Sequence, residues 1–146
     1  MQDVLNAGTG RCINSETKVG LYIELRDYQT NLDTLGIDMA EALDTVLKAN
    51  KLDTIADCQD KLPIIVQSFE IPALNKFATL SDLPLVYLFR DGESFDWDEV
   101  SEKFHGVGPP SDIVVNPPGS ITGDTNNSDF INQVHALGLA VHPWTF

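Results

Sequence analysis

Basic residues are scarce in this sequence: its 146 residues include 9 lysines and arginines against 22 aspartates and glutamates. The formal net charge is -13 at pH 7. Nucleic acids and anionic lipid surfaces attract proteins of the opposite sign, so this balance excludes electrostatic binding to either. A phosphate ester would meet the same negative field, and a protein that handles one needs a bound cation to offset that field locally.

Long apolar runs are also absent. No stretch approaches the roughly 20 apolar residues that a membrane-spanning helix needs. The N-terminus does not show the basic and then apolar pattern of a signal peptide. Because the apolar fraction is 42% and the length suits one ordinary core, the sequence predicts a soluble globular domain.

Cysteine is rare as well, with Cys12 and Cys58 the two in the chain. They could form one disulfide in an oxidising compartment or remain two free thiols, and neither belongs to a C-x-x-C or metal-ligand spacing. A glycine-rich loop of the kind that cradles dinucleotides or phosphates follows none of the apolar runs. Its absence disfavours a nucleotide-binding open sheet.

The sequence does contain a regular alternation of apolar strands and amphipathic helices. Strands are expected at about residues 20–25, 62–69, 83–89, 112–115 and 139–146. Helices are expected at 39–50 behind the cap Asp38, at 71–79, at 97–105, and from about Ser128 to a stop at Gly138. Residues 27–36 and 116–127 are expected to be polar, irregular connections. Such alternation is typical of βαβ units and a parallel sheet, either open or closed into an eight-stranded barrel.

The first predicted strand, Gly20-Leu21-Tyr22-Ile23-Glu24-Leu25-Arg26-Asp27, ends in a burst of charge. Because side chains alternate along a strand, Glu24 and Arg26 point the same way. A buried strand does not normally carry both charges on one face unless they have partners. Either they pair with charges on neighbouring strands, or Glu24 holds a cation and Arg26 an anion at the mouth of a site.

Polar side chains gather at the carboxyl ends of the predicted strands, where a parallel barrel builds its active site. They are Glu24, Arg26, Gln67, Arg90, His142 and Trp144. His142 and Trp144 share one parity of the last strand, so both are candidates to face such a site. A hydrogen-bonded structural histidine is an equally good interpretation of His142.

With these residues assembled, the chain resembles the glycerophosphodiester phosphodiesterases, in particular their larger periplasmic or secreted type. The first matching motif is the strand at residues 20–26. The others are Val66-Gln67-Ser68-Phe69, Gly106-Val107-Gly108-Pro109 and Leu139-Ala140-Val141-His142-Pro143-Trp144-Thr145, of which the last is the most specific. The resemblance covers nearly the whole chain, which is similar to roughly the C-terminal half of that family.

The resemblance implies an α/β fold of the (β/α)8 TIM-barrel type. Residues 1–146 would supply about five βα units, as the C-terminal part of one barrel domain. It also implies hydrolysis of glycerophosphodiesters to glycerol 3-phosphate and an alcohol with a divalent cation, Ca²⁺ or Mg²⁺, and a periplasmic or secreted location. By position, Glu24 corresponds to a cation ligand and Arg26 to a phosphate-binding residue. Gln67 falls in a pocket-side strand, and Trp144 lies near the glycerol.

The sequence departs from that family in several places. Arg26 stands where the family usually has a lysine, and a planar guanidinium is not a point charge. The family's His-Arg-Gly motif, Glu-x-Asp pair and second His-Asp motif, which supply further cation ligands and the general acid and base, do not occur. The three histidines, His105, His135 and His142, do not match these motifs, so no catalytic residue is assigned in this chain.

Two hypotheses follow. In the first, a further N-terminal segment supplies the other strands and the catalytic histidines of the barrel, and the complete protein is an enzyme acting on a small glycerophosphodiester. In the alternative, the chain is a non-catalytic scaffold or cation-binding protein derived from the barrel. The acidic cluster at residues 91–99 would suit weak calcium association. It lacks the spacing of an EF-hand loop, however, and is better interpreted as a solvated face.

Overall fold

The computed structural model describes residues 1–14, 19–59, 61–115 and 128–144, with the backbone alone at 9–14, 115 and 128. The chain forms two compact units, Met1–Leu85 and Val86–Phe146. The hydrogen-bonded strands follow the order β1-β2-β3-β4-β5. The fold is therefore an open α/β sheet of five parallel strands that alternate with helices, as the sequence predicts.

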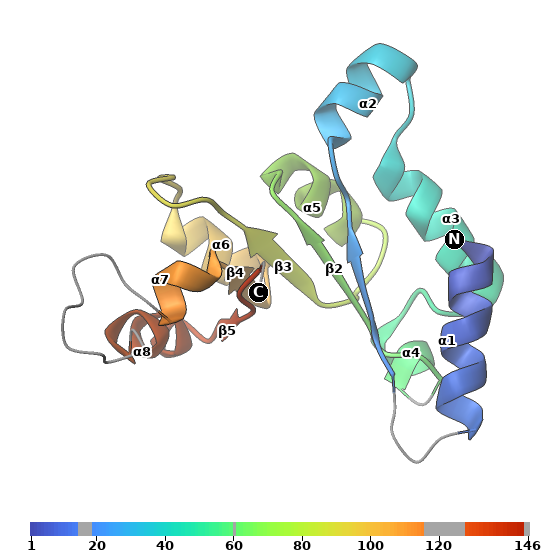
Figure 1. Cartoon of the computed structure of the whole chain (residues 1–146). Coiled ribbons are helices and arrows are strands. Elements are labelled where there is room, and N and C mark those ends of the chain that lie inside the picture. The colour runs from blue at the N-terminus through green and yellow to red at the C-terminus, as the bar shows by residue number, and fades with distance from the viewer. Residues whose placement is uncertain (15–18, 60, 116–127, 145–146) are drawn as a thin grey trace. The chain divides into compact units, whose positions relative to one another are not determined.

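The first unit holds two complete strands and five helices among its described residues. Its elements are α1 (Gln2–Asn14), β1 (Leu21–Glu24), α2 (Tyr28–Leu35), α3 (Met39–Asn50), α4 (Ile55–Gln59), β2 (Ile64–Ser68) and α5 (Ile71–Ala78). Strands β1 and β2 are parallel and lie side by side, in a register that runs from Leu21 opposite Ile64 to Glu24 opposite Gln67 (Figure 1).

The two faces of this strand pair differ in burial. In β2, Ile64, Val66 and Ser68 are buried, and α5, which packs on β2, buries Leu74 and Phe77. The side chains of opposite parity are exposed or half-buried: they are Tyr22, Glu24, Ile65 and Gln67. We call these four residues the open face of the first unit. Alternation along the strands puts every one of them on the side away from the buried set.

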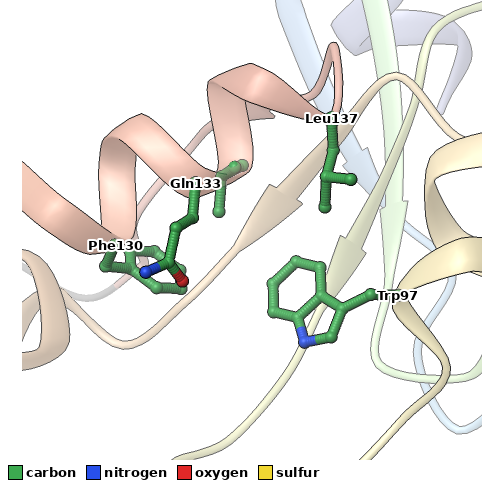
Figure 2. A pocket seen from close by; sticks show the side chains of 5 residues that line it. Trp97, Phe130, Gln133 and Leu137 are labelled. Atoms are coloured by element: carbon green, nitrogen blue, oxygen red, sulfur yellow. The ribbon is translucent and has the colours of Figure 1, made fainter.

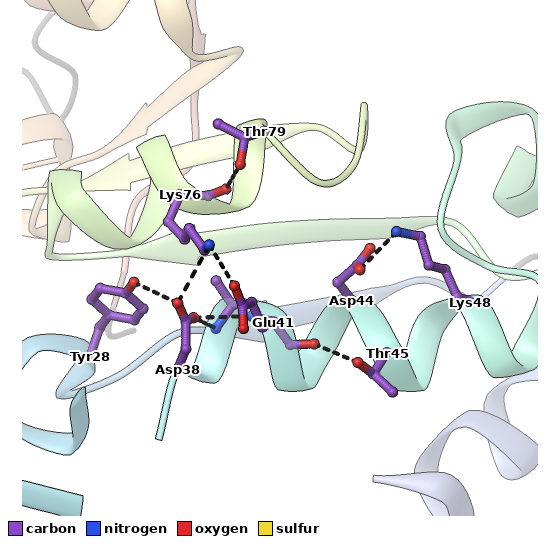
Figure 3. Close-up of polar contacts among 9 residues, drawn as sticks. Tyr28, Asp38, Glu41, Asp44, Thr45, Lys48, Lys76 and Thr79 are labelled. Atoms are coloured by element: carbon purple, nitrogen blue, oxygen red, sulfur yellow. Dashed lines mark hydrogen bonds and ion pairs between the residues drawn. The ribbon is translucent and has the colours of Figure 1, made fainter. Parts of the chain in front are cut away.

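A polar joint connects helices α2, α3 and α5. The Asp38 carboxylate caps α3 by accepting hydrogen bonds from the backbone N–H groups of Ala40 (2.9 Å) and Glu41 (3.0 Å), as the sequence predicts. Its second oxygen accepts from the Tyr28 hydroxyl at 3.3 Å. Lys76 of α5 lies 3.8 Å from Asp38 and 2.6 Å from Glu41 (Figure 3). One carboxylate thus begins a helix and also links it to two neighbours.

The second unit continues the pattern with shorter strands. Its elements are β3 (Leu85–Leu88, whose first residue closes the first unit), α6 (Trp97–Lys103), β4 (Gly106–Gly108), α7 (Ser111–Val115), α8 (Ser128–Ala136) and β5 (Ala140–Val141). β4 is parallel to β3 on one side and to β5 on the other. Gly138, with φ of 78°, ends the last helix turn as predicted.

The predicted fourth strand is wrong. Residues 112–115 lie in α7, and the strand is Gly106–Gly108, which was not among the predicted strands. Its glycines are required by close backbone approach, because a Cβ at Gly106 would lie 2.8 Å from the Ala140 carbonyl oxygen. One at Gly108 would lie 2.3 Å from the Leu88 Cδ2 atom. Glycine in this strand therefore marks tight packing between its two neighbours.

Residues 27–36 were expected to be irregular, and this prediction is also wrong, because Tyr28–Leu35 form α2. The helix begins behind Asp27, whose side chain makes no capping hydrogen bond. Instead, the Glu70 carboxylate accepts from the backbone N–H groups of Tyr28 (2.7 Å) and Gln29 (2.9 Å). The cap comes from a residue about forty positions away, which local sequence patterns cannot indicate.

Other predicted elements match with small differences. The helices at 39–50, 71–79 and 97–105 are α3, α5 and α6, while α4 was not predicted and α1 extends to Asn14, further than expected. Ala78, expected to pack on the sheet, is exposed, and so is Leu137 of the predicted stripe on α8. The connection at 116–127 and the side chains of Cys12 and Ser128 lie outside the described residues. Among the described helices, none is long and apolar enough to cross a membrane.

Candidate functional site

Glu24 and Gln67 are register partners at the carboxyl ends of β1 and β2, and both belong to the open face. Both side chains are half-buried. In the described part of the chain, no ion pair involves Glu24, so the structural ion-pair interpretation of this carboxylate gains no support. The strand pair thus places an acid and an amide side by side where parallel strands end, which is where α/β proteins bind ligands.

Arg26 lies just beyond the end of β1 and is held loosely. Its Nε is 3.8 Å from a carboxylate oxygen of Asp27, and the two side chains are 77% and 71% exposed. An exposed pair of this kind contributes little to stability. The guanidinium is therefore available to bind an anion such as a phosphate in a bidentate manner.

Two residues that sequence reasoning missed hold this segment in place. The hydroxyl of Ser68, which is fully buried, donates to the Leu25 carbonyl oxygen at 2.7 Å and accepts from the Glu70 N–H at 3.0 Å. The Glu70 carboxylate then caps α2. Because Leu25 lies between Glu24 and Arg26, this chain of bonds fixes the backbone that carries both. The one sequence signal was a serine at the end of a buried strand with a glutamate two residues later.

Trp144 lies beyond the end of β5 in the second unit and is anchored by three hydrogen bonds. Its backbone N–H donates to the Pro109 carbonyl oxygen at 3.0 Å, and its own carbonyl oxygen accepts from the Ser111 N–H at 3.2 Å. Its indole Nε1 donates to the Phe89 carbonyl oxygen at 3.2 Å. The ring is therefore fixed against the carboxyl end of β3, and its orientation is set before any ligand binds.

His142 lies two residues before Trp144, and strand parity predicts that both side chains face the same side of the second unit. Its backbone N–H donates to the Val107 carbonyl oxygen at 2.8 Å, so the backbone continues the pairing of β5 with β4. The side chain is half-buried, and this burial lowers the pKa of its imidazole below the usual value. Burial therefore favours the neutral form of His142. The other two histidines, His105 and His135, are exposed, as expected for residues in or beside helices.

Three of the acidic residues in the predicted cluster at 91–99 have structural contacts. Glu93 accepts from the Tyr87 hydroxyl at 2.8 Å and from the Arg90 N–H at 2.9 Å. Asp96 caps α6, and Glu99 pairs with Lys103 at 2.8 Å. These contacts agree with the interpretation of the cluster as a solvated face. Within the residues that the structure describes, no three His, Cys, Asp or Glu side chains gather where they could hold a metal ion.

A comparison with protein families shows to which family the chain belongs. The sequence matches the glycerophosphoryl diester phosphodiesterase family over residues 1–146. The chain belongs to this family. A search of curated proteins gave no match. Membership places the chain in a family of phosphodiesterases, and the parallel sheet is consistent with part of the barrel of a glycerophosphoryl diester phosphodiesterase.

A divalent cation is typical of this phosphodiesterase family, and the described residues do not form a site for one. Ca²⁺ takes six to eight oxygen ligands and Mg²⁺ needs a near-ideal octahedron. Glu24 offers one carboxylate on the open face, with the amide of Gln67 as its neighbour. Two side chains cannot complete either coordination sphere, so further ligands are needed for any cation chemistry.

Proposed function

We propose that this chain is part of a metal-dependent glycerophosphodiester phosphodiesterase, which hydrolyses its substrate to glycerol 3-phosphate and an alcohol. The observation that carries this proposal is the family match along the whole of residues 1–146. The placement of polar residues at strand ends supports it: Glu24, Arg26 and Gln67 in the first unit, and Trp144 in the second.

Each of these residues has a role in the proposal. Arg26 would bind the phosphoryl oxygens and stabilise the negative charge that develops on them, because its guanidinium is exposed and can bind two oxygens at once. Gln67 would donate its amide hydrogens to a substrate oxygen. The indole of Trp144 would pack against the glycerol. Glu24 would be one ligand of the cation, which would supply positive charge beside the phosphate when bound.

The proton-transfer groups and the remaining ligands would come from further strands of the barrel. The described sheet supports this idea, because β1 is its edge strand. A cavity of about 290 Å³ beside β1 is lined almost entirely by apolar side chains, among them Ile23, Leu25 and Val46. Met1 and Ile37 of the same lining are about half exposed. Additional barrel elements packed on this edge would bury that surface. The periplasmic or secreted location belongs to the same proposal.

The test measures glycerol 3-phosphate released from glycerophosphocholine by the protein that carries the complete barrel, with and without a chelator. Glu24→Gln and Arg26→Gln should each lower kcat/KM by about 100-fold, because the first removes the proposed carboxylate ligand of the cation and the second the proposed positive charge on the phosphoryl oxygens. Glu102→Gln is the matched control, since Glu102 is an exposed carboxylate of α6. Full activity of both variants, or activity that a chelator leaves unchanged, would contradict the proposal.

The alternative of a non-catalytic scaffold or cation-binding protein keeps one observation in its favour. None of the three histidines lies in a motif of the general acid and base, and two of them are exposed on or beside helices. If the complete protein binds Ca²⁺ but releases no glycerol 3-phosphate, the scaffold is the better description. Glu24→Gln should then weaken calcium binding measured by calorimetry.

A further inference from the structure

A small cavity lies between helices α6 and α8 of the second unit. Its volume is about 220 Å³, and its lining is Trp97, Phe130, Gln133, Val134 and Leu137. Three of these residues lie in α8 and Leu137 follows its last residue, and together they have the i, i+3, i+4, i+7 spacing of one helix face. Figure 2 shows the indole of Trp97 across the gap from Gln133 and Leu137. The volume is below the roughly 300 Å³ at which pockets for whole ligands begin, so it suits a small group.

One wall of this cavity is formed by aromatic rings that pack against further aromatic rings. The rings of Trp97 and Phe130 are 6.4 Å apart at 66°, which leaves a wedge between an indole and a phenyl ring. Behind them, Phe95 packs 4.6 Å from Trp97, and Phe89 lies 6.2 Å from Trp97 and 6.4 Å from Phe130. Phe89 follows Leu88 in the chain, so its ring lies on the opposite face of the strand from Leu88 and Gly108. The cavity is therefore separate from the face of His142 and Trp144.

The charges around the cavity select the kind of ligand. None of the described side chains that line it is charged. The sequence neighbours of its two rings are Asp96, Asp98 and Asp129, and the whole chain carries a net charge of -13. An anion would meet repulsion without a partner. A cation would meet both a favourable field and two aromatic rings, a kind of side chain that attracts cations.

The polar groups of the lining narrow the choice further. A primary ammonium carries three N–H donors, and each needs an acceptor when it leaves water. The side chain of Gln133 offers one amide oxygen, and the other four lining side chains are apolar apart from the indole N–H, which is itself a donor. A quaternary ammonium has no N–H and presents methyl groups, so it loses no hydrogen bond in an apolar, aromatic site.

We infer that this cavity binds a quaternary ammonium group, such as the trimethylammonium of choline. The methyl groups fill the wedge between Trp97 and Phe130, and the side chains of Val134 and Leu137 cover the remainder. The inference does not depend on the proposed phosphodiesterase activity, because it concerns the opposite face of the strands. If the proposed phosphodiesterase activity is not found, the inference about this cavity is unaffected, and the reverse also holds.

Binding is tested with choline and its neutral isostere 3,3-dimethylbutan-1-ol, at constant ionic strength set with NaCl. Saturation-transfer NMR follows the methyl signals on the unaltered chain. The Trp144→Phe variant supplies a fluorescence readout, because the chain has two tryptophans and Trp97 then remains as the one emitter. Choline should bind roughly 2- to 30-fold more tightly than the isostere, which is the range expected for a cation on aromatic faces. Equal binding of the two, or no saturable binding of choline, would overturn the inference.

Variants of Gln133 locate the site without disturbing the core, because this side chain is exposed. Gln133→Lys places a positive charge beside the cavity and should weaken choline binding at least 5-fold, while Gln133→Glu should strengthen it. Neither change should affect the neutral isostere by more than about 2-fold. Trp97→Leu should abolish the preference for choline, provided that cooperative unfolding shows a folded chain. An affinity for choline that is the same in Gln133→Lys, Gln133→Glu and the unaltered chain would contradict the inference.

The same group could be free or part of a lipid, and vesicles of pure phosphatidylcholine distinguish the two sources. Sedimentation with vesicles that Gln133→Lys abolishes would place the ligand in a membrane surface. Choline binding without sedimentation would place it in solution. Either result supports a quaternary ammonium site, whereas sedimentation that the variant does not alter would contradict it.

Discussion

Cys58 shows how burial decides the chemistry of a single residue. Its side chain is 3% exposed, and its Sγ donates to the Leu52 carbonyl oxygen at 3.2 Å. The sequence left open whether the two cysteines are bonded, and the structure shows Cys58 as a free thiol. Burial is the main reason that the pKa of this thiol is raised from 9.0 to about 11, with a smaller contribution from Asp57. A buried neutral thiol of this kind is inert.

This shift predicts a loss of stability at alkaline pH. The thiolate is disfavoured in the folded state, so the unfolded chain releases its proton near pH 9 while the folded chain holds it until about pH 11. Cys58 should therefore have no effect on the pH dependence below pH 9, and should lower the free energy of unfolding by roughly 2–3 kcal/mol between pH 9 and pH 11.

Urea unfolding of the reduced chain and of Cys58→Ala from pH 8 to pH 11 measures this effect. Subtracting the free energy of unfolding of the variant from that of the unaltered chain cancels the contribution of all other titrating groups. The cavity left by alanine adds a constant difference that does not change with pH. A difference that stays constant up to pH 11 would contradict the raised pKa.

At the scale of elements, α2 depends on a residue far away in the sequence. The Glu70 carboxylate caps its first turn, while the Glu70 carbonyl oxygen accepts from Ala73 N–H in the first turn of α5. The residue therefore joins two helix N-termini. A negative charge at the N-terminus of α2 also complements the helix dipole.

Replacing Glu70 with alanine should lower the free energy of unfolding by about 1–2 kcal/mol, because two backbone donors lose a charged acceptor. Hydrogen exchange at the Tyr28 and Gln29 amides should accelerate. The Ala73 amide, which is bonded to the backbone of residue 70, is the internal control and should exchange as before.

The Glu70→Gln variant separates the effect of side-chain length from the effect of the negative charge. Glutamine keeps an acceptor of the same reach, so it should retain part of the protection at Tyr28. Unchanged exchange at both α2 amides in Glu70→Ala would show that another group begins the helix.

At the scale of the whole molecule, the excess of 13 negative charges is the dominant electrostatic feature. The described ion pairs are few and mostly at the surface, such as Lys76 with Glu41 and Lys103 with Glu99. Repulsion among the remaining carboxylates destabilises the folded state and is screened by salt, because the Debye length falls from about 30 Å at 0.01 M to about 8 Å at 0.15 M.

Raising NaCl from 0.01 to 0.15 M should therefore increase the free energy of unfolding by about 1 kcal/mol, which is comparable to one or two surface ion pairs. Thermal and urea unfolding at the two concentrations measure it, with KCl as the control for effects specific to sodium. A decrease with salt would mean that the ion pairs outweigh the general repulsion.

The sequence by itself determined the class of fold and the helices with local signals. Asp38 precedes α3 by one residue and an apolar periodicity follows it, so the information lies within one turn. The parity of Glu24 with Tyr22, and of His142 with Trp144, likewise follows from the alternation of strand side chains. The family resemblance was also carried by short motifs in order, and the family match agrees with it.

Tertiary structure alone decided the rest. Helix α2 needs a cap from Glu70, and β4 is a strand because its glycines fit between Leu88 and the backbone of β5. Those interactions join residues tens of positions apart, and no window of sequence contains both partners. Burial of Cys58 and the fixed indole of Trp144 are decided in the same way, since a pKa or a ring orientation depends on what surrounds the group in space.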